Sequence, residues 1–254
     1  MNPIAIIAAL DRELKPLVES WKQSKVEFQG KTFVIYEQQN KARQNEVQPN
    51  LVAMAGGIGS RAAERAARAV IAQYRPEALI SAGMAGALIR SLKVGCILTP
   101  NVIMDGNSGN EYRCTLGDGL VAGGVLVSAG EIAGQESKQK LVEDFHALAV
   151  DMEAAAVAEV AMEAGIGFCC VKAISDESSF PMLPLNQFVS PKGDFLTSNF
   201  VLWAIFRPWT WSRVIALERN SNRAANMLCD WLKAHVTNGL RPGKVVRLEP
   251  ATNI

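Results

Sequence analysis

Short apolar runs alternate along the chain with longer segments in which apolar residues recur at helical spacing. Ile4 to Leu10, Leu51 to Ala55 and Ala78 to Ala82 each have the length and continuous apolar character of a buried strand. Apolar strands separated by helices are typical of a largely parallel sheet that helices cover on both faces. The pattern therefore predicts the α/β class.

The segments after these strands carry the first chemical features. Asp11 is predicted to open a helix with Glu13 in its first turn, and Ser60 is expected to cap an alanine-rich helix. The third strand leads into Gly83-Met84-Ala85-Gly86, where we expect a loop whose glycines let the backbone approach a ligand closely.

Two carboxylates stand out further along. Residues 95–104 and 119–128 are predicted strands and residues 135–148 a helix, followed by a helix over 151–164 and an apolar strand over 167–174. Glu153 falls near the start of that last helix, and Asp176 follows the strand. Since ligands of open α/β sheets bind at the carboxyl ends of strands, the pair suits acid and base chemistry on a small molecule. Two simpler interpretations remain, namely that Asp176 caps a turn and that Glu153 is a solvated first-turn residue.

Composition narrows the possible functions. With 254 residues and 49% hydrophobic content, the chain can form one large domain. The 26 Lys and Arg balance 25 Asp and Glu, so we expect no nucleic-acid partner. Five cysteines without C-x-x-C spacing and two isolated histidines predict no metal site and a reducing compartment. The first apolar stretch is too short for a signal or a membrane span, so we expect a cytoplasmic protein.

The C-terminal third, from about residue 178 to 254, differs in composition and is predicted to be an appendage to the single domain 1–254. It carries nine Lys and Arg against four Asp and Glu, and four of the five tryptophans. Residues 195–211 contain one charge, Arg207, and are too short to span a bilayer. This stretch could lie on the inner membrane face, because tryptophan favours the bilayer interface and basic residues favour anionic headgroups. The alternative is a buried lid or a subunit contact.

Seven short segments occur in the order found in one enzyme superfamily. They are Ala8-Ala9-Leu10-Asp11-Arg12-Glu13, Gly57-Ile58-Gly59, Ala82-Gly83-Met84-Ala85-Gly86, Leu92-Lys93-Val94-Gly95, Val127-Ser128, Val150-Asp151-Met152-Glu153-Ala154 and Ala173-Ile174-Ser175-Asp176. On these segments the chain resembles the purine nucleoside phosphorylase and nucleosidase superfamily, in particular the branch that contains 5'-methylthioadenosine/S-adenosylhomocysteine nucleosidase.

The resemblance implies a three-layer α/β/α sandwich around a mixed, mostly parallel sheet. It also implies a homodimer that needs no cofactor and cleaves the N-glycosidic bond of an adenine nucleoside. Such a bond breaks through a cationic sugar, so a catalyst needs an acid on the leaving-group side and a base for water on the other.

Site residues follow from the same resemblance. Asp176 would donate a proton toward adenine N7, with Ser175 holding its carboxyl group, and Glu13 would activate water. Glu153 would accept hydrogen bonds from the ribose hydroxyls while Met152 lies against the sugar. Backbone groups near Ile132 would hold the base, and the segment with Gly83 and Met84 would lie near the nucleophile.

One departure bears on the nucleophile. Met84 stands where the related enzymes tend to carry a hydroxyl residue, so a phosphate would lose a hydrogen-bond donor there. Hydrolysis is therefore preferred over phosphorolysis, although Arg12 could still serve an anion.

The C-terminal third resembles one branch of the superfamily, the hopanoid-associated phosphorylases that act on adenosylhopane. The run Arg207-Pro208-Trp209-Thr210-Trp211 and the following Asn220-Ser221 carry this likeness. The implied substrate is an adenosyl group on a large lipid, which would need an apolar wall beside the ribose 5' position. Small nucleosides are the alternative substrates.

Two other function classes are possible on parts of the sequence. Gly57-Ile58-Gly59-Ser60-Arg61-Ala62 matches the dinucleotide fingerprint of NAD-binding oxidoreductases, but the acidic residue expected about 20 positions later is missing. A non-catalytic nucleoside-binding module would need neither Glu13 nor Asp176, so the presence of both argues against it.

Overall fold

A computed structural model describes residues 2–38, 51–114, 123–236 and 242–248. The strands are β1 (Ile4–Ala8), β2 (Lys22–Phe28), β3 (Lys31–Glu37), β4 (Leu51–Ala55), β5 (Ala78–Ala87), β6 (Ile97–Leu98), β7 (Val102–Asp105), β8 (Glu111–Arg113), β9 (Val125–Ser128), β10 (Ala149–Asp151), β11 (Gly167–Asp176) and β12 (Val246–Leu248). The helices are α1 (Asp11–Val18), α2 (Ser60–Tyr74), α3 (Gln135–Phe145), α4 (Ala154–Glu163), α5 (Thr197–Ile205) and α6 (Trp211–His235), with short 3-10 turns η1 (Leu185–Phe188) and η2 (Pro208–Thr210).

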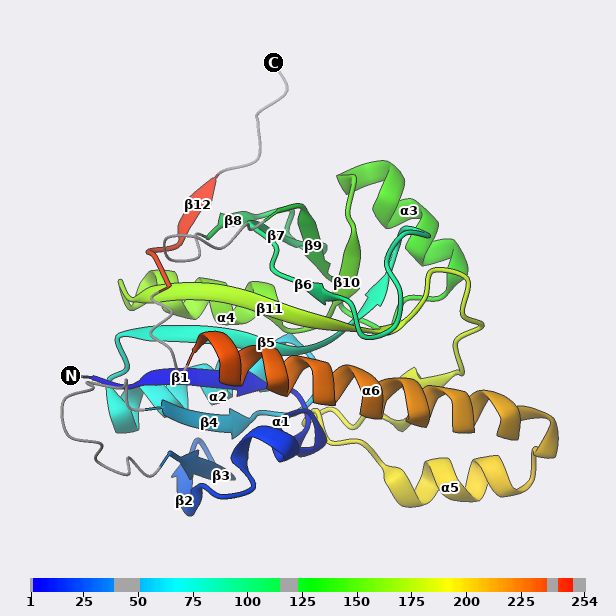
Figure 1. Cartoon of the computed structure of the whole chain (residues 1–254), viewed down its shortest axis with the longest axis horizontal. Helices are drawn as coiled ribbons and strands as arrows, with labels where there is room; N and C mark the ends of the chain where they lie inside the picture. Colours follow the sequence, from blue (N-terminus) through cyan, green and yellow to red (C-terminus); the bar gives the residue numbers. More distant parts are fainter. Residues whose placement is uncertain (1, 39–50, 115–122, 237–241, 249–254) are drawn as a thin grey trace.

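The strands form one mixed sheet in the order β12-β8-β7-β9-β10-β5-β1-β4-β3-β2, and β11 pairs with β5 and β6 (Figure 1). Its centre is parallel, because β1 pairs in parallel with β4 and β5, and β5 with β11. The short strand β10 pairs antiparallel with β5. The α/β class and the mostly parallel sheet are therefore confirmed.

Helices cover both faces of this sheet (Figure 1). The alanines of α2 and α4 pack together on one face, and their small side chains let both helices lie close to the strands. On the other face, α1 and the C-terminal half of α6 bury Leu14, Leu228 and Leu232 against β1, β5 and β11. These three layers are the sandwich that the resemblance implied.

Several predicted ends of strands and helices are wrong, mostly because pairing with neighbouring strands decides where an element stops. Residues 83–86 form no loop, because β5 continues to Ala87 between β11 and β10. Residues 95–104 contain two short strands instead of one. The helix expected from Asp151 begins at Ala154, since Asp151 still pairs with Ser128 in the sheet. Ser60 caps nothing, as Gly59 is the N-cap of α2. Residues 119–122 of the predicted strand 119–128 lie outside the described residues.

The last third divides between core and surface. The C-terminal half of α6 belongs to the core, whereas none of the nine residues of α5 is buried. Within the described residues, no helix is both long enough and apolar enough to cross a membrane.

Candidate active site

A cavity of about 180 Å³ opens at the carboxyl ends of β1, β5 and β11. Its walls contain seven of the eight predicted site residues: Glu13, Met84, Ile132, Met152, Glu153, Ser175 and Asp176. The eighth, Gly83, lies directly beside the Glu13 carboxylate. Segments that are far apart in the sequence therefore meet at the end of the sheet where ligands of α/β proteins bind.

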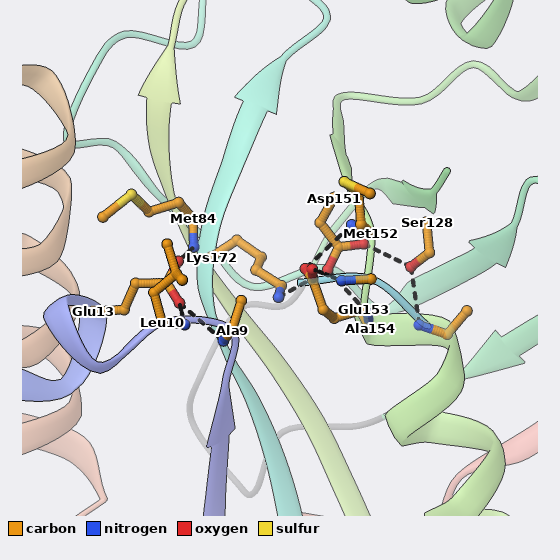
Figure 2. Close-up of polar contacts among 12 residues, drawn as sticks. Ala9, Leu10, Glu13, Met84, Ser128, Asp151, Met152, Glu153, Ala154 and Lys172 are labelled. Atoms are coloured by element: carbon orange, nitrogen blue, oxygen red, sulfur yellow. Dashed lines mark hydrogen bonds and ion pairs between the residues drawn. The ribbon is translucent and has the colours of Figure 1, made fainter. Parts of the chain in front are cut away.

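Glu13 is 4% exposed and is held by three backbone N–H groups. Its Oε2 accepts hydrogen bonds from Ala9 at 2.9 Å and Leu10 at 2.8 Å, and its Oε1 accepts one from Met84 at 3.0 Å (Figure 2). Because Glu13 is the third residue of α1, its side chain can fold back onto the start of its own helix. The carboxylate is therefore fixed before any ligand binds.

Gly83 is required by this arrangement. Its φ of +150° is unfavourable for residues with a side chain, and an added Cβ would lie 3.3 Å from Glu13 Oε1. The sequence suggested that the backbone at Gly83 lies close to a ligand. In the structure it lies close to the side chain of the catalytic candidate Glu13.

Glu153 faces the same cavity from the start of α4. Its Oε1 accepts a hydrogen bond from the Gly59 backbone N–H at 2.8 Å. That amide would be needed by a dinucleotide phosphate, so its use by Glu153 counts against the NAD fingerprint. Burial, and then the nearby Asp151, raise the pKa of Glu153 to about 7, while Lys172 acts in the opposite direction.

A buried ion pair supports this wall from behind. Lys172 Nζ lies 2.8 Å from Asp151 Oδ2, and both side chains are almost completely buried (Figure 2). Asp151 also accepts hydrogen bonds from the Ser128 hydroxyl at 2.6 Å and the Ala154 backbone N–H at 3.0 Å. Burial is the largest single influence and lowers the pKa of Lys172, but the attraction of Asp151, together with smaller effects of Cys170 and Glu153 and the hydrogen bond to Asp151, outweighs it, so the pKa is raised. Asp151, the last residue of β10, thus accepts a hydrogen bond from the first residue of α4 and joins the strand to the helix next to Glu153.

Asp176 reaches the cavity through a bulge in β11. Ile174 pairs with Ala85 and Asp176 with Gly86, so Ser175 is an extra residue relative to β5. Such a bulge redirects side chains, and both Ser175 and Asp176 line the cavity. The Ser175 hydroxyl donates to Asp176 Oδ1 at 3.0 Å, as the resemblance implied.

Lys138 was not among the predicted site residues, but it contacts Asp176. This residue of α3 is 5% exposed, and its Nζ lies 2.5 Å from Asp176 Oδ2. In the sequence it is one of several charged residues in a polar helix, and no local signal marks it as buried.

The backbone of Ile132 is hydrogen-bonded to Asn186, which was also not among the predicted site residues. The Asn186 carboxamide accepts a hydrogen bond from the Ile132 N–H at 2.8 Å and donates one to the Ile132 carbonyl at 3.3 Å.

In the part of the chain that the structure describes, no group of three or more His, Cys, Asp or Glu side chains is arranged to hold a metal ion.

Replacing Lys172 by methionine should destabilise the fold by about 3 kcal/mol, because the buried Asp151 carboxylate loses its counter-ion. Urea unfolding would measure this loss. The control is Lys140→Met, since the Lys140 side chain is 67% exposed and its ion pair with Glu136 lies at the surface. An unchanged midpoint for Lys172→Met would contradict the role of the pair.

Glu153→Gln should change how stability depends on pH. The raised pKa means that the folded state of the wild type keeps a proton between pH 4.5 and about 7, whereas the unfolded state has lost it. Wild-type stability from this group is therefore fully present below about pH 4.5 and lost as the pH rises through about 7, by roughly 3 kcal/mol in all.

The amide of the glutamine variant does not titrate, so its stability relative to wild type should rise by that amount from pH 4.5 to 8. Thermal unfolding across this range would measure the difference. Glu136→Gln, at an exposed position of α3, is the control and should show no such trend. Parallel curves for wild type and Glu153→Gln would rule out the raised pKa.

A sequence profile of the phosphorylase superfamily matches residues 3–117 and 113–182 of this chain. The match ends close to the point at which the appendage was predicted to begin. It includes every segment that supplies a predicted site residue.

Curated relatives agree with this match. The 5'-methylthioadenosine/S-adenosylhomocysteine nucleosidase of Staphylococcus epidermidis is 30% identical over 151 residues, which are 47% of this chain and 65% of that protein. The enzyme of the same name from Actinobacillus succinogenes is 26% identical over 202 residues, 68% of this chain and 85% of that protein.

A solved structure extends the likeness to the fold. The 5'-methylthioadenosine/S-adenosylhomocysteine nucleosidase of Helicobacter pylori, solved with butyl-thio-DADMe-Immucillin-A, aligns with a TM-score of 0.66 and 18% identity, covering 92% of this chain and 97% of that one. None of these three is a hopanoid-associated phosphorylase, so that finer likeness stays a prediction. Because the profile spans well over half of the chain, this protein belongs to the phosphorylase superfamily.

Proposed function

We propose that this protein releases adenine from an adenine nucleoside by hydrolysis of the N-glycosidic bond. Its family and the curated nucleosidases that it resembles make it an N-glycosidase. The main support for water as the nucleophile, instead of phosphate, is the Glu13 carboxylate. It is buried at the cavity wall and held by three backbone amides. A fixed carboxylate can orient a water molecule and take its proton as the bond to the sugar forms.

The charge of the cavity supports the same reaction. Five carboxyl groups line it, Glu13, Glu131, Asp151, Glu153 and Asp176, against the cationic Arg12 and Lys138 in the lining and Lys172, which pairs with Asp151 from behind. An excess of negative charge in a small cavity favours the oxocarbenium-like sugar of the transition state. The same excess disfavours a phosphate dianion.

Phosphorolysis is the alternative, and Arg12 supports it as the cation closest in sequence to Glu13. Against it, the Met84 backbone N–H already donates to Glu13, so an anion beside β5 could not use this donor. Met84 offers no hydroxyl in its place.

The adenine ring has a matching site at Ile132. Asn186 now presents an acceptor and a donor to the Ile132 N–H and carbonyl. Adenine N1 and its 6-amino group offer the same pair in the same order, so the base would replace the carboxamide. Glu153 would then lie near the ribose hydroxyls, with Met152 against the sugar.

Glu13→Gln and Asp176→Asn should each lower adenine release from 5'-methylthioadenosine by roughly 10² to 10⁴-fold, because each removes one partner of the acid and base pair. Chromatography of released adenine, with and without phosphate, would measure the rates, and titration with the substrate should show that the Asp176→Asn variant still binds. Asp144→Asn, on the exposed side of α3, should behave as wild type.

Two results would contradict the proposal. Release that depends strictly on phosphate would make the enzyme a phosphorylase. Near-normal turnover by the Asp176→Asn variant would remove Asp176 from the reaction.

We further propose that the substrate is an adenosyl lipid such as adenosylhopane and that the protein binds the membrane surface from the cytoplasmic side. The support is the apolar hairpin, which we define as residues 196–215 of α5, η2 and the start of α6. Nine of the ten exposed large apolar side chains among the described residues fall between 196 and 227, including Phe206 at 71% and Trp209 at 68%.

The shape and charge of the hairpin support a bilayer as the covering surface. In Figure 1, α5 lies beside the first half of α6 and away from the sheet. The charged residues from 195 to 217 are Arg207 and Arg213, with no acidic residue among them, which suits anionic headgroups. Leu217 and Ser221 of α6 line the cavity, so the hairpin is continuous with the active-site wall.

The hairpin should bind vesicles that contain phosphatidylglycerol, and the double variant Phe206→Ser and Trp209→Ser should bind them at least tenfold more weakly, because both exposed rings are lost. Cosedimentation would measure binding. Val246→Ser, which removes an exposed apolar residue far from the hairpin in sequence, is the control.

Two outcomes would count against a membrane surface. One is equal pelleting of wild type and double variant. The other is loss of a homodimer in the double variant, seen by analytical ultracentrifugation, which would assign the hairpin to the subunit contact that the family resemblance implies. A clear preference for 5'-methylthioadenosine over adenosylhopane would remove the lipid substrate.

A further inference from the structure

We propose that a second cavity, beside the middle of α6, binds the phosphate group of an anionic phospholipid headgroup. This site rests on the proposed membrane contact of the apolar hairpin and is independent of the proposed reaction. The cavity has a volume of about 650 Å³, within the range of about 300 to 1,000 Å³ that is typical of ligand pockets. It shares no lining residue with the active-site cavity.

Two arginines of α6, Arg219 and Arg223, supply positive charge to this cavity. They stand four positions apart, so they lie on one face of the helix, where like charges repel. The sequence places no acidic residue three or four positions from either of them. Among the described residues, neither guanidinium group has a hydrogen-bond or ion-pair partner. The pair is therefore suited to an anion from outside the chain.

The carboxylate of Glu177 does not neutralise the two arginines. Glu177 is the only acidic residue among the described residues that line this cavity. Its Oε2 lies 2.9 Å from Lys93 Nζ, so its charge is already balanced by a cation outside the lining. The cavity thus keeps the positive charge of both arginines.

Gly95 holds the side chain of Arg223 in place. An added Cβ at Gly95, whose φ is +89°, would lie 3.2 Å from Arg223 Nε and 3.6 Å from Arg223 Cγ. The arginine side chain therefore packs against the backbone just before β6, in an arrangement that glycine allows. Its guanidinium group is partly ordered before an anion binds, which lowers the entropic cost of binding.

The other groups in the walls fit a phosphate that is attached to glycerol. Guanidinium groups bind phosphate oxygens through paired N–H groups. Ser179 and Asn220 offer neutral donors in the same cavity. Val94, Phe180 and Pro181 add apolar surface that can contact the carbon atoms next to the phosphate.

The position of the cavity favours a membrane lipid over free phosphate. In Figure 1, α6 runs from the sheet out to the apolar hairpin. From Trp211 to Arg219 the helix rises about 12 Å. Apolar side chains of interfacial helices enter the boundary of headgroups and acyl chains to a depth of about 5 to 10 Å. If the hairpin enters a bilayer in this way, the arginines lie at the level of the headgroups.

Wild type should bind dihexanoyl-phosphatidylglycerol, a short-chain lipid, below the concentration at which this lipid forms micelles. The double variant Arg219→Gln and Arg223→Gln should bind it roughly tenfold or more weakly, because charge-assisted hydrogen bonds to the phosphate are lost. Isothermal titration calorimetry would measure both affinities. Lys22→Gln with Lys25→Gln removes the same amount of charge from exposed positions of the edge strand β2 and should bind as wild type.

Three results would overturn the site. One is the absence of lipid binding by the wild type, and another is equal affinity of the wild type and the arginine double variant. The third is binding of inorganic phosphate to the wild type as tightly as the lipid, which would assign the arginines to a free anion. Dihexanoyl-phosphatidylcholine, whose headgroup has no net charge, should bind roughly tenfold or more weakly than the phosphatidylglycerol lipid.

The hairpin variant Phe206→Ser and Trp209→Ser separates this site from the proposed membrane contact. It should keep the wild-type affinity for the short-chain lipid, since neither residue lines the second cavity. Loss of that affinity would place the lipid on the hairpin and overturn the site. The titration requires no turnover, so a wild type that releases no adenine would contradict the proposed function and leave this test intact.

Discussion

Burial of negative charge is the constraint on which this site depends. Carboxyl groups from α1, β10, β11 and the start of α4 meet at one end of the sheet, and each is compensated differently. Backbone amides hold Glu13, Lys172 pairs with Asp151, and Lys138 pairs with Asp176. If every carboxylate were fully neutralised, the cavity would have no negative charge left to stabilise a cationic sugar. Glu153, whose pKa is raised to about 7 chiefly by burial and then by Asp151, is the group left with the least support.

The sequence predicted the fold class because its strands are short, apolar and separated by helices that carry small residues. Its errors fall where pairing with distant strands decides the structure. Residues 83–86 contain two glycines and read locally as a loop, yet they extend β5 because β11 and β10 lie on either side. Asp151 reads as a helix start, yet Ser128 in the neighbouring strand keeps it in the sheet.

The site was predictable to the extent that its residues stand at strand ends or helix starts. Glu13 and Glu153 lie in or beside the first turn of a helix, and Asp176 ends an apolar strand, so each has a local signal. Lys138 and Asn186 have none. Both lie on surface segments that fold back over the cavity, and only the tertiary structure brings them to Asp176 and Ile132.

The two halves of α6 explain why the cavity and the apolar hairpin belong together. The C-terminal half buries Leu228 and Leu232 against the sheet, whereas the first turns expose Trp211 and Ile215. Burying one such side chain is worth about 1.5 to 3 kcal/mol, so leaving a row of them in water favours any surface that covers them. The change from buried to exposed occurs near Leu217 and Ser221, in the cavity wall. From Leu217 back to Trp211 the helix extends about 9 Å, so one continuous helix joins the wall of the cavity to the apolar hairpin.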